Sequence, residues 1–262
     1  MRAVALICTR NEELHIARCL EDLHAAGIET ILIDNGSTDR TVAIAQGYIG
    51  KGLLRIETLP WRGHFALAEQ IAKKQEITEA IDHDWVLHVD ADEWLCPAEP
   101  GATLSAAIER VDAEGYNCIN FDEFVFAPSP DEDFTACGSY ARRMTTYYFF
   151  EPEPRRLMRA WRRDLKPGMD TGHHLSSDRL RLYPHNFVLR HYIALSHAHM
   201  VEKYVGRHFD PAEVARGWHV NRLSLTADAL VLKPSPYLKR LERWDSTAFD
   251  RSMPAKTHFW QW

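Results

Sequence analysis

The chain has 262 residues, of which 45% are hydrophobic and 26% charged, and such values are ordinary for a globular protein with a large core. A formal net charge of −6 gives no electrostatic reason to expect a nucleic-acid partner. Five cysteines without C-x-x-C spacing favour reduced thiols. Apolar residues 3–8 are too few for a signal peptide, and no run approaches a membrane span. We expect a cytoplasmic protein without a transmembrane segment, and leave peripheral membrane attachment and a homo-oligomer open.

The first half of the chain alternates between short apolar runs and amphipathic stretches. Apolar runs typical of buried strands occupy residues 3–8, 30–33, 53–57 and 85–89. The predicted helices between them cover residues 14–26, about 38–46, and 65–81. Gly27 fits the end of the first helix, and Ser37 or Thr38 the start of the second. This alternation predicts a mostly parallel sheet with right-handed crossovers.

The second half changes character after a helix predicted at about residues 104–111. Longer β-like runs follow at residues 116–126, 144–150, 157–162, 179–183 and 187–195. We expect some of them to pair antiparallel, as a second half of the sheet or a flap. From Ser196, a suitable N-cap, the chain turns helical again. We therefore predict an α/β domain over residues 1–195 and a mostly helical extension, residues 196–262, packed on it.

Residues 85–93 form an apolar run that ends in the carboxylates of Asp90, Asp92 and Glu93. Open α/β sheets bind ligands at this carboxyl end of their strands. Asp90 and Asp92 bracket one small residue, so both can converge on a hard cation, and such cations hold phosphates. An EF-hand loop is excluded because Leu95 stands where its glycine belongs. The segment predicts metal-assisted chemistry on a phosphorylated substrate, although carboxylates after a strand also serve only as loop formers.

Two further polar loops follow predicted strands. Thr9-Arg10-Asn11-Glu12 comes after the first, and residues 34–39, Asp-Asn-Gly-Ser-Thr-Asp, after the second. In a parallel sheet both open on the same edge as Asp90. Each has a purely structural interpretation as well. Asn11 and Glu12 suit a helix start, and residues 34–37 suit a tight turn.

Residues 8–13, 32–39 and 85–93, in this order, spacing and strand context, resemble glycosyltransferase family 2. The resemblance covers about the first hundred residues and, more loosely, Arg190-His191-Tyr192 through Lys203 and Arg207. It implies the GT-A (Rossmann-like) fold, a mixed sheet flanked by helices. It also implies metal-dependent transfer of a sugar from a nucleoside-diphosphate sugar to a hydroxyl acceptor, whether saccharide, lipid or glycan.

The resemblance further implies residue roles at the first two loops. Thr9, Arg10, Asn11 and Glu12 would lie along the base and ribose. Asp34, with Asn35 beside it, would accept hydrogen bonds from the base. Arg10 departs from the family, which often has an aromatic residue there.

The same resemblance assigns the acidic segment and the loop at residues 61–64. Asp90 would face the ribose or a metal-bound water, and Asp92 would ligate the Mn²⁺ or Mg²⁺ that bridges the diphosphate. Trp61-Arg62-Gly63-His64 replaces the family's Asn- and Gly-rich signature. Arg62 is a candidate phosphate contact there, although a single loop arginine is more often solvated.

Candidates in the second half rest on weaker patterns. His191, late on a predicted strand, is a candidate for a further metal ligand or phosphate contact, because imidazole is a common ligand. Lys203 and Arg207, four residues apart on a predicted helix, are candidates for binding a diphosphate. Purely structural interpretations fit these residues equally well. His191 is then a histidine whose hydrogen bonds are satisfied within the protein, and Lys203 and Arg207 belong to a solvent-exposed charged face of the helix.

An inverting transferase also needs a general base for the acceptor hydroxyl. Asp170, in the polar run of residues 166–178, is the first candidate, and Glu123 and Asp122 are the reserve. Glu93 is a further candidate, although it follows the metal pair directly and could only orient the loop.

Three alternatives stay open. One is a pseudoenzyme or binding module that keeps the nucleotide-sugar site. Another is an Asp-dependent phosphohydrolase, which normally carries its Asp-x-Asp after the first strand, where this chain has Thr9-Arg10-Asn11. A sugar nucleotidyltransferase would need a Gly-rich basic opening loop, which is missing. The sugar, base and stereochemical outcome are not predicted.

Overall fold

The computed structural model of the protein describes residues 1–152, 157–169 and 174–262. Asp170 therefore lies outside the described residues. The chain forms two compact units, each described by itself below. Unit 1 comprises residues 1–62, 67–121 and 156–188, and unit 2 comprises residues 63–66, 122–155 and 189–262. The domain boundary expected at residue 195 stays a prediction.

The centre of unit 1 is a parallel sheet. Its parallel strands are β1 (Ala3–Thr9), β2 (Glu29–Asp34), β3 (Leu53–Thr58) and β4 (Trp85–Val89). They lie in the order β3-β2-β1-β4, so β1 has a parallel neighbour on each side. Strand β8 (Met158–Arg162) runs antiparallel to β4 and also pairs with the first residues of β6 (Cys118–Phe126). The prediction of four parallel strands joined to antiparallel ones is confirmed.

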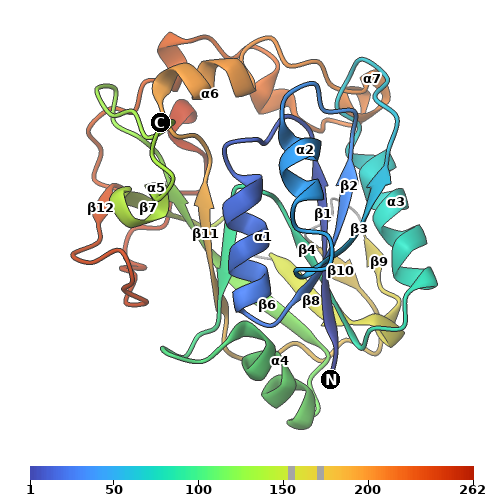
Figure 1. Ribbon diagram of the computed structural model, residues 1–262. Coiled ribbons are helices and arrows are strands. Elements are labelled where there is room, and N and C mark those ends of the chain that lie inside the picture. Colours follow the sequence, from blue (N-terminus) through green and yellow to red (C-terminus); the bar gives the residue numbers. More distant parts are fainter. Residues whose placement is uncertain (153–156, 170–173) are drawn as a thin grey trace. The chain divides into compact units, whose positions relative to one another are not determined.

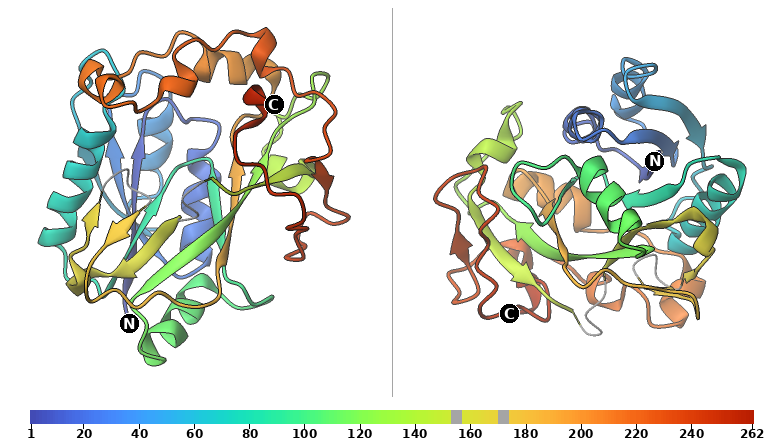
Figure 2. Two further views of the ribbon diagram at one scale, coloured as in Figure 1. Left: turned by 180° about the vertical axis from the view of Figure 1, so that it is seen from behind. Right: turned by 90° about the horizontal axis from the view of Figure 1, so that it is seen from below.

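Helices cover both faces of this sheet. Helices α1 (Ile16–Ala25) and α2 (Thr41–Gln46) lie on one face, and α3 (Leu67–Ala80) lies on the other (Figures 1 and 2). Side chains alternate along a strand, so Val4 and Leu6 of β1 point to the same face, where they pack with Ile77 of α3. Helix α4 (Leu104–Ala113) begins at Thr103, whose hydroxyl accepts from the Ala106 amide at 3.3 Å. The two faces are thus buried as the periodicity predicts.

The shorter strands of unit 1 were not all foreseen. Strand β5 (Glu93–Cys96) follows the acidic segment directly, and β9 (Gly168–Met169) pairs with β10 (Leu175–Ser176). The predicted strand at residues 179–183 is wrong, because only Leu182 makes a bridge, to Cys118. The Arg181 amide donates instead to the Asn117 side chain at 2.7 Å. The backbone pairing of this segment is confined to one bridge, in which the Asn117 amide donates to the Arg181 carbonyl at 3.0 Å and the Tyr183 amide donates to the Cys118 carbonyl at 2.8 Å.

Unit 2 is built on the rest of β6, which pairs antiparallel with β7 (Thr146–Phe150). Strand β12 (Lys239–Arg240) adds to β7, and β11 (Phe187–Tyr192) leads into the unit. Its helices are α5 (Tyr140–Arg143), α6 (His197–Tyr204) and α7 (Pro211–Ala215). The core gathers Val125, Tyr148, Ile193, Met200 and Leu230.

Residues 196–262 are not mostly helical, contrary to expectation. Besides α6 and α7 they contain 3-10 turns at Val220–Arg222, Asp228–Leu230 and Phe259–Gln261, and much of the rest is irregular. Pro234, Pro236 and Pro254 interrupt this stretch, and a proline cannot donate the backbone bond that a helix interior needs. The predicted N-cap Ser196 is confirmed, since its hydroxyl accepts from the His199 amide at 3.1 Å. Among the described residues, no helix is long and apolar enough to cross a membrane.

Candidate functional site

Three polar loops leave the same edge of the unit 1 sheet. Strands β1, β2 and β4 end at Thr9, Asp34 and Val89. Thr9 is in register with Asp34, and Ile7 with Val89. The loops at residues 9–12, 34–39 and 90–93 therefore emerge side by side, as the sequence predicts for a parallel sheet.

The first two loops are tied together by hydrogen bonds. The Asn35 amide donates to the Thr9 carbonyl at 2.8 Å, and the Asn11 amide donates to Ser37 Oγ at 3.0 Å. In return, Asn11 Oδ1 accepts from the Thr38 amide at 2.8 Å. Asn11 has φ 56°, a left-handed conformation that asparagine tolerates better than most residues. Asn11 is thus a cross-loop connector, and the interpretation of it as a helix N-cap is wrong: α1 begins after His15.

A second correction concerns the start of α2. Asp39 Oδ1 accepts from the Thr41 amide at 2.9 Å, so the helix begins at Thr41 rather than after Ser37 or Thr38. Those two residues instead bond Asn11. Asp39 also uses Oδ2 to accept from the Glu13 amide at 3.1 Å, and Thr41 Oγ1 accepts from the Glu12 amide at 2.8 Å. The loop that carries Glu12 is therefore fixed by the loop after β2.

Asp34 is buried at the end of β2 and closes its own turn. Its carboxylate accepts from the amides of Gly36 and Ser37, each at 3.2 Å. Asn35 is buried as well, and its Nδ2 donates to the Leu59 carbonyl at 3.0 Å. The tight-turn interpretation is thus correct as far as it goes, and the same turn presents the Asp34 carboxylate at the sheet edge.

Arg10 and Trp61 form a stacked pair beside that turn. The Arg10 guanidinium lies 3.9 Å from the Trp61 ring centroid and donates to the carbonyls of Asn35, at 3.1 Å, and Gly36. A Cβ at Gly36 would lie 2.8 Å from Trp61 Cβ, so glycine permits this approach. The planar guanidinium thus stands where the family often has an aromatic ring. The neighbouring Arg62 is mostly exposed and forms an ion pair with Glu69 at 3.0 Å.

Asp90-Ala91-Asp92-Glu93 is a turn closed from both ends, which we name the acidic turn. The Glu93 amide donates to the Asp90 carbonyl at 3.0 Å, and Glu93 Oε2 accepts from the Asp90 amide at 2.9 Å. The Asp90 side chain is 45% exposed, whereas Asp92 and Glu93 are buried. Asp90 is therefore the most exposed of the three carboxylates.

Two arginines contact the acidic turn, and neither was singled out from the sequence. Arg159, buried on β8, donates to Glu93 Oε1 and, at 3.4 Å, to Asp90 Oδ2. Arg18 on α1 donates to the carbonyls of Ala91, at 3.2 Å, and Glu93, at 3.0 Å. One sequence feature does point to Arg159, which stands between Met158 and Ala160 within a β-like run. A charged side chain in a buried strand needs an oppositely charged or hydrogen-bonding partner.

No three or more His, Cys, Asp or Glu side chains of the described residues form a group that could hold a metal ion by themselves. The acidic turn supplies two aspartates. Mg²⁺ is commonly bound by one or two carboxylates together with substrate phosphates and water, and Mn²⁺ also suits oxygen ligands. The residues present fit a cation that binds together with a diphosphate.

The remaining candidates lie in unit 2. His191 Nδ1 lies 2.6 Å from Glu123 Oε1, so these two candidates contact each other. Asp122 is buried and pairs with Arg251 at 2.7 Å. Lys203 lies in the last turn of α6. The predicted roles of Glu123, His191 and Lys203 stay predictions.

A family model described as "Glycosyl transferase family 2" matches residues 4–156, more than half of the chain. The chain belongs to glycosyltransferase family 2. The matched region contains all three loops of the sheet edge, and membership confirms the predicted family and its GT-A-type α/β fold.

Among curated relatives of this family 2 member, LpsC of Rhizobium meliloti, a lipopolysaccharide core biosynthesis glycosyltransferase, is 37% identical over 92 residues, which are 35% of this chain and 32% of LpsC. An uncharacterized glycosyltransferase of Rickettsia conorii is 35% identical over 91 residues, 35% of this chain and 29% of that one. The matches thus span about a third of the length of these relatives.

Two solved structures resemble this family 2 chain at low sequence identity. S. aureus TarS 1-349, crystallised with UDP-GlcNAc, has a TM-score of 0.44 and 16% identity, over 78% of this chain and 62% of the TarS 1-349 chain. Glucosyl-3-phosphoglycerate synthase from Mycobacterium tuberculosis, in complex with Mn²⁺, UDP and glucosyl-3-phosphoglycerate, has a TM-score of 0.37 and 18% identity, over 63% of this chain and 57% of that one.

Proposed function

We propose that the protein is a metal-dependent glycosyltransferase that moves a sugar from a nucleoside-diphosphate sugar to a hydroxyl acceptor. One observation carries the proposal: in a member of glycosyltransferase family 2, the loops at residues 9–12, 34–39 and 90–93 emerge from adjacent parallel strands at one sheet edge. Polar loops at that edge are where open α/β sheets bind nucleotides.

The nucleoside is bound, in this proposal, by the first two loops. Asp34 accepts from two backbone amides, and a carboxylate has roughly four acceptor sites, so it retains capacity for a donor on the base. Thr9 Oγ1 is buried and has no hydrogen-bond partner within the described part of the chain, and a nucleotide group would satisfy it. The Arg10 and Trp61 pair supplies a flat surface of the kind on which a base stacks.

The diphosphate is held through the acidic turn. Asp92 and Asp90 would bind Mn²⁺ or Mg²⁺, and the cation, when bound, stabilises the negative charge that develops on the departing nucleoside diphosphate. The two aspartates keep the cation at the sheet edge, and the bonds that close the acidic turn fix their spacing. Arg62, which is also in unit 1, is proposed as a further phosphate contact.

The acceptor hydroxyl must lose its proton as the new glycosidic bond forms, and an inverting reaction needs a general base to accept that proton. We propose Asp170 as the general base, with Glu123 as the alternative. The 2.6 Å contact with His191 supports a fixed orientation for the Glu123 carboxylate. The name of LpsC, a lipopolysaccharide core biosynthesis glycosyltransferase, supports a saccharide acceptor.

Calorimetric titration with ADP, CDP, GDP, UDP and dTDP, each with and without Mn²⁺, tests the donor site. We expect one diphosphate to bind in a Mn²⁺-dependent manner, and Asp92→Ala to abolish that dependence. Asp82→Ala is the matched control, because Asp82 is highly exposed and precedes β4, whereas Asp92 follows it. Absence of binding by all five diphosphates would overturn the proposal.

A donor-hydrolysis assay separates the alternatives. A transferase releases nucleoside diphosphate slowly from the correct donor when water replaces the acceptor. A pseudoenzyme would bind the nucleotide sugar but would not cleave it, so no nucleoside diphosphate would be formed. An Asp-dependent phosphohydrolase would instead hydrolyse the diphosphate linkage of the donor and release nucleoside monophosphate and sugar phosphate.

A further inference from the structure

The acidic turn is bonded to two arginines that are distant from it in the chain. Arg159 lies 66 residues from Glu93, and Arg18 lies 75 residues from it. Both arginines belong to unit 1, as does the turn. Three carboxylates within four residues repel one another, so a turn that holds them needs cationic or amide partners.

Arg159 contacts the turn through carboxylates. The pair with Glu93 is almost completely buried, with side chains 5% and 1% exposed. The other oxygen of Glu93 accepts from the Asp90 amide at 2.9 Å, so the carboxylate joins Arg159 to the backbone of Asp90. Arg159 also reaches Asp90 Oδ2 at 3.4 Å. A change at Arg159 therefore acts on both the backbone and the side chain of Asp90.

Arg18 contacts the turn from α1 through backbone carbonyls. It bonds the carbonyls that flank Asp92, those of Ala91 and Glu93. The same guanidinium forms an ion pair with Asp22 at 2.7 Å, which holds it against its own helix. The peptide group that precedes Asp92 and the one that follows Glu93 are thereby bonded to α1.

We propose that Arg18 and Arg159 are positioning residues that fix Asp90 and Asp92 for a divalent cation bound with a nucleoside diphosphate, and that Glu93 acts in this network rather than as the general base. The proposal rests on the proposed function, because it assigns the acidic turn to a cation and diphosphate. Partners that orient metal ligands typically change metal affinity about 10- to 100-fold when they are removed.

The primary test measures the Mn²⁺ concentration that half-saturates binding of the preferred nucleoside diphosphate. We expect Arg159→Met and Arg18→Met each to raise it about 10- to 100-fold. Glu93→Gln should raise it as well. The double variant Glu93→Gln/Arg159→Met should raise this concentration little more than Arg159→Met alone. Both changes break the same connection, which runs from Arg159 through Glu93 to Asp90.

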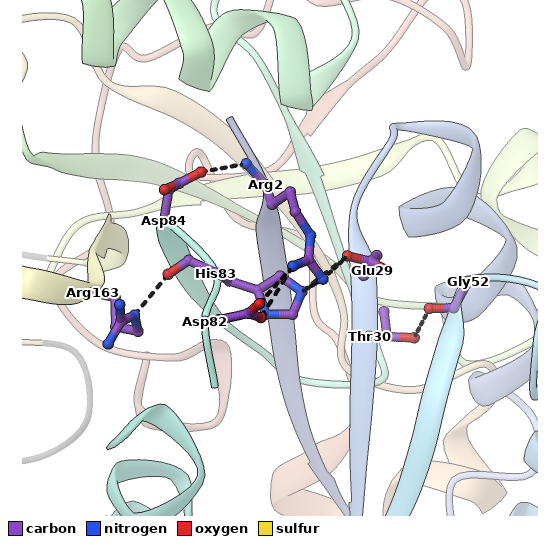
Figure 3. Close-up of polar contacts among 8 residues, drawn as sticks. All are labelled: Arg2, Glu29, Thr30, Gly52, Asp82, His83, Asp84 and Arg163. Carbon is purple, nitrogen blue, oxygen red and sulfur yellow. Dashed lines mark hydrogen bonds and ion pairs between the residues drawn. The ribbon is translucent and has the colours of Figure 1, made fainter. Parts of the chain in front are cut away.

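Arg163→Met is the matched control. Arg163 also donates to a backbone carbonyl, that of His83, at 2.8 Å (Figure 3). His83 precedes β4, whereas the acidic turn follows it. The control removes an arginine bond from unit 1 without touching the turn, and its half-saturating Mn²⁺ concentration should equal that of wild type.

A second readout needs neither metal nor activity. In metal-free protein, hydrogen exchange of the amides of Asp90 and Glu93 should accelerate at least about tenfold in Arg159→Met and remain unchanged in Arg163→Met. Arg159→Lys, which keeps the charge but not the forked geometry, gives the same measurement if Arg159→Met does not fold.

The outcomes distinguish failure of the positioning role from failure of the proposed glycosyltransferase function. Wild-type protein that binds no nucleoside diphosphate overturns the proposed function and, with it, this inference. Wild-type protein that binds, together with folded Arg18 and Arg159 variants whose half-saturating Mn²⁺ concentration is unchanged, overturns the positioning role alone.

Discussion

The Arg10 guanidinium lies 3.9 Å from the centroid of the Trp61 ring and donates to the Asn35 carbonyl at 3.1 Å. One side chain thus joins the loop after β1 to the turn after β2 and to the indole after β3. A guanidinium over an indole contributes about 0.5–2 kcal/mol. The pair thus links the segments that follow β1, β2 and β3, and its removal is the first test.

Arg10→Ala should weaken binding of the preferred nucleoside diphosphate by about 3- to 30-fold, because the stacked surface and the bonds to the turn after β2 are both lost. Calorimetric titration at saturating Mn²⁺ measures the change. Arg55→Ala is the control, since Arg55 forms a local ion pair, with Glu57 at 2.8 Å. Equal loss of affinity in the two variants would contradict a role for the Arg10 and Trp61 pair.

Asn11 provides a test of the cross-loop bonds. Asn11→Ala loses the acceptor for the Thr38 amide and places an alanine at φ 56°, so the free energy of unfolding should fall by about 1–3 kcal/mol. Asn11→Gly should cost less, because glycine adopts this conformation without strain. Urea denaturation measures both. The opposite order, with glycine the worse residue, would show that strain at Asn11 is unimportant.

His258 predicts how the stability of unit 2 depends on pH. Burial, together with the charges of Arg222 and His191, holds the pKa of His258 well below its usual value of 6.5. Its Nδ1 lies 2.8 Å from the Tyr148 hydroxyl. Below about pH 6.5 the unfolded chain protonates this histidine and the folded protein does not, because the folded-state pKa is lower. The free energy of unfolding should therefore be unaffected by His258 above about pH 6.5 and fall by up to about 1.4 kcal/mol per pH unit below it.

The corresponding experiment compares wild type with His258→Gln by urea denaturation between pH 5 and 8. The variant should be less stable than wild type at pH 8 and should lose less stability on going to pH 5. Identical pH dependence of the free energy of unfolding in the two proteins would show that His258 does not determine it.

Glu29 lies at the start of β2, opposite the end that carries Asp34. Burial raises the pKa of Glu29, but hydrogen bonds and charges from His83 and Arg2 outweigh burial, so its pKa is lowered overall (Figure 3). Such a carboxylate stabilises the fold above its ordinary pKa, and the contribution is lost as pH falls through the folded-state pKa. The Glu29 side chain is 38% exposed in its ion pair with Arg2. We therefore expect this pair to contribute less than about 1 kcal/mol to the free energy of unfolding.

Glu29→Gln should therefore lower stability slightly at pH 7, and the difference from wild type should shrink below about pH 4.5. Nucleotide binding should not change, since Glu29 is at the far end of the strand. A loss of nucleotide affinity in this variant would place the site elsewhere than at the carboxyl ends of the strands.

The sequence predicts much of the sheet edge because its signals are local. Apolar runs that end in Thr9, Asp34 and Asp90 identify buried strands, and parallel pairing then brings their ends together. Family resemblance adds roles to those positions. Both kinds of signal are read from a few neighbouring residues.

Contacts between distant residues could not be predicted in this way. Nothing near Arg159 or Arg18 indicates that each reaches the acidic turn, because their partners lie more than sixty residues away. Asn11 was misinterpreted because its left-handed backbone depends on Ser37 and Thr38. In residues 196–262 the helix start at Ser196 is predicted correctly, but the prediction of a mostly helical extension is wrong because prolines there favour irregular structure.

The central claim is metal-dependent sugar transfer at the acidic turn. Its most direct test is release of nucleoside diphosphate from a panel of nucleoside-diphosphate sugars, with Mn²⁺ and with excess EDTA, for wild type, Asp92→Asn and Asp82→Asn. We predict release from one donor by wild type and Asp82→Asn, loss of at least about 100-fold in Asp92→Asn, and loss with EDTA. Full release by Asp92→Asn, or by wild type in excess EDTA, would contradict the account.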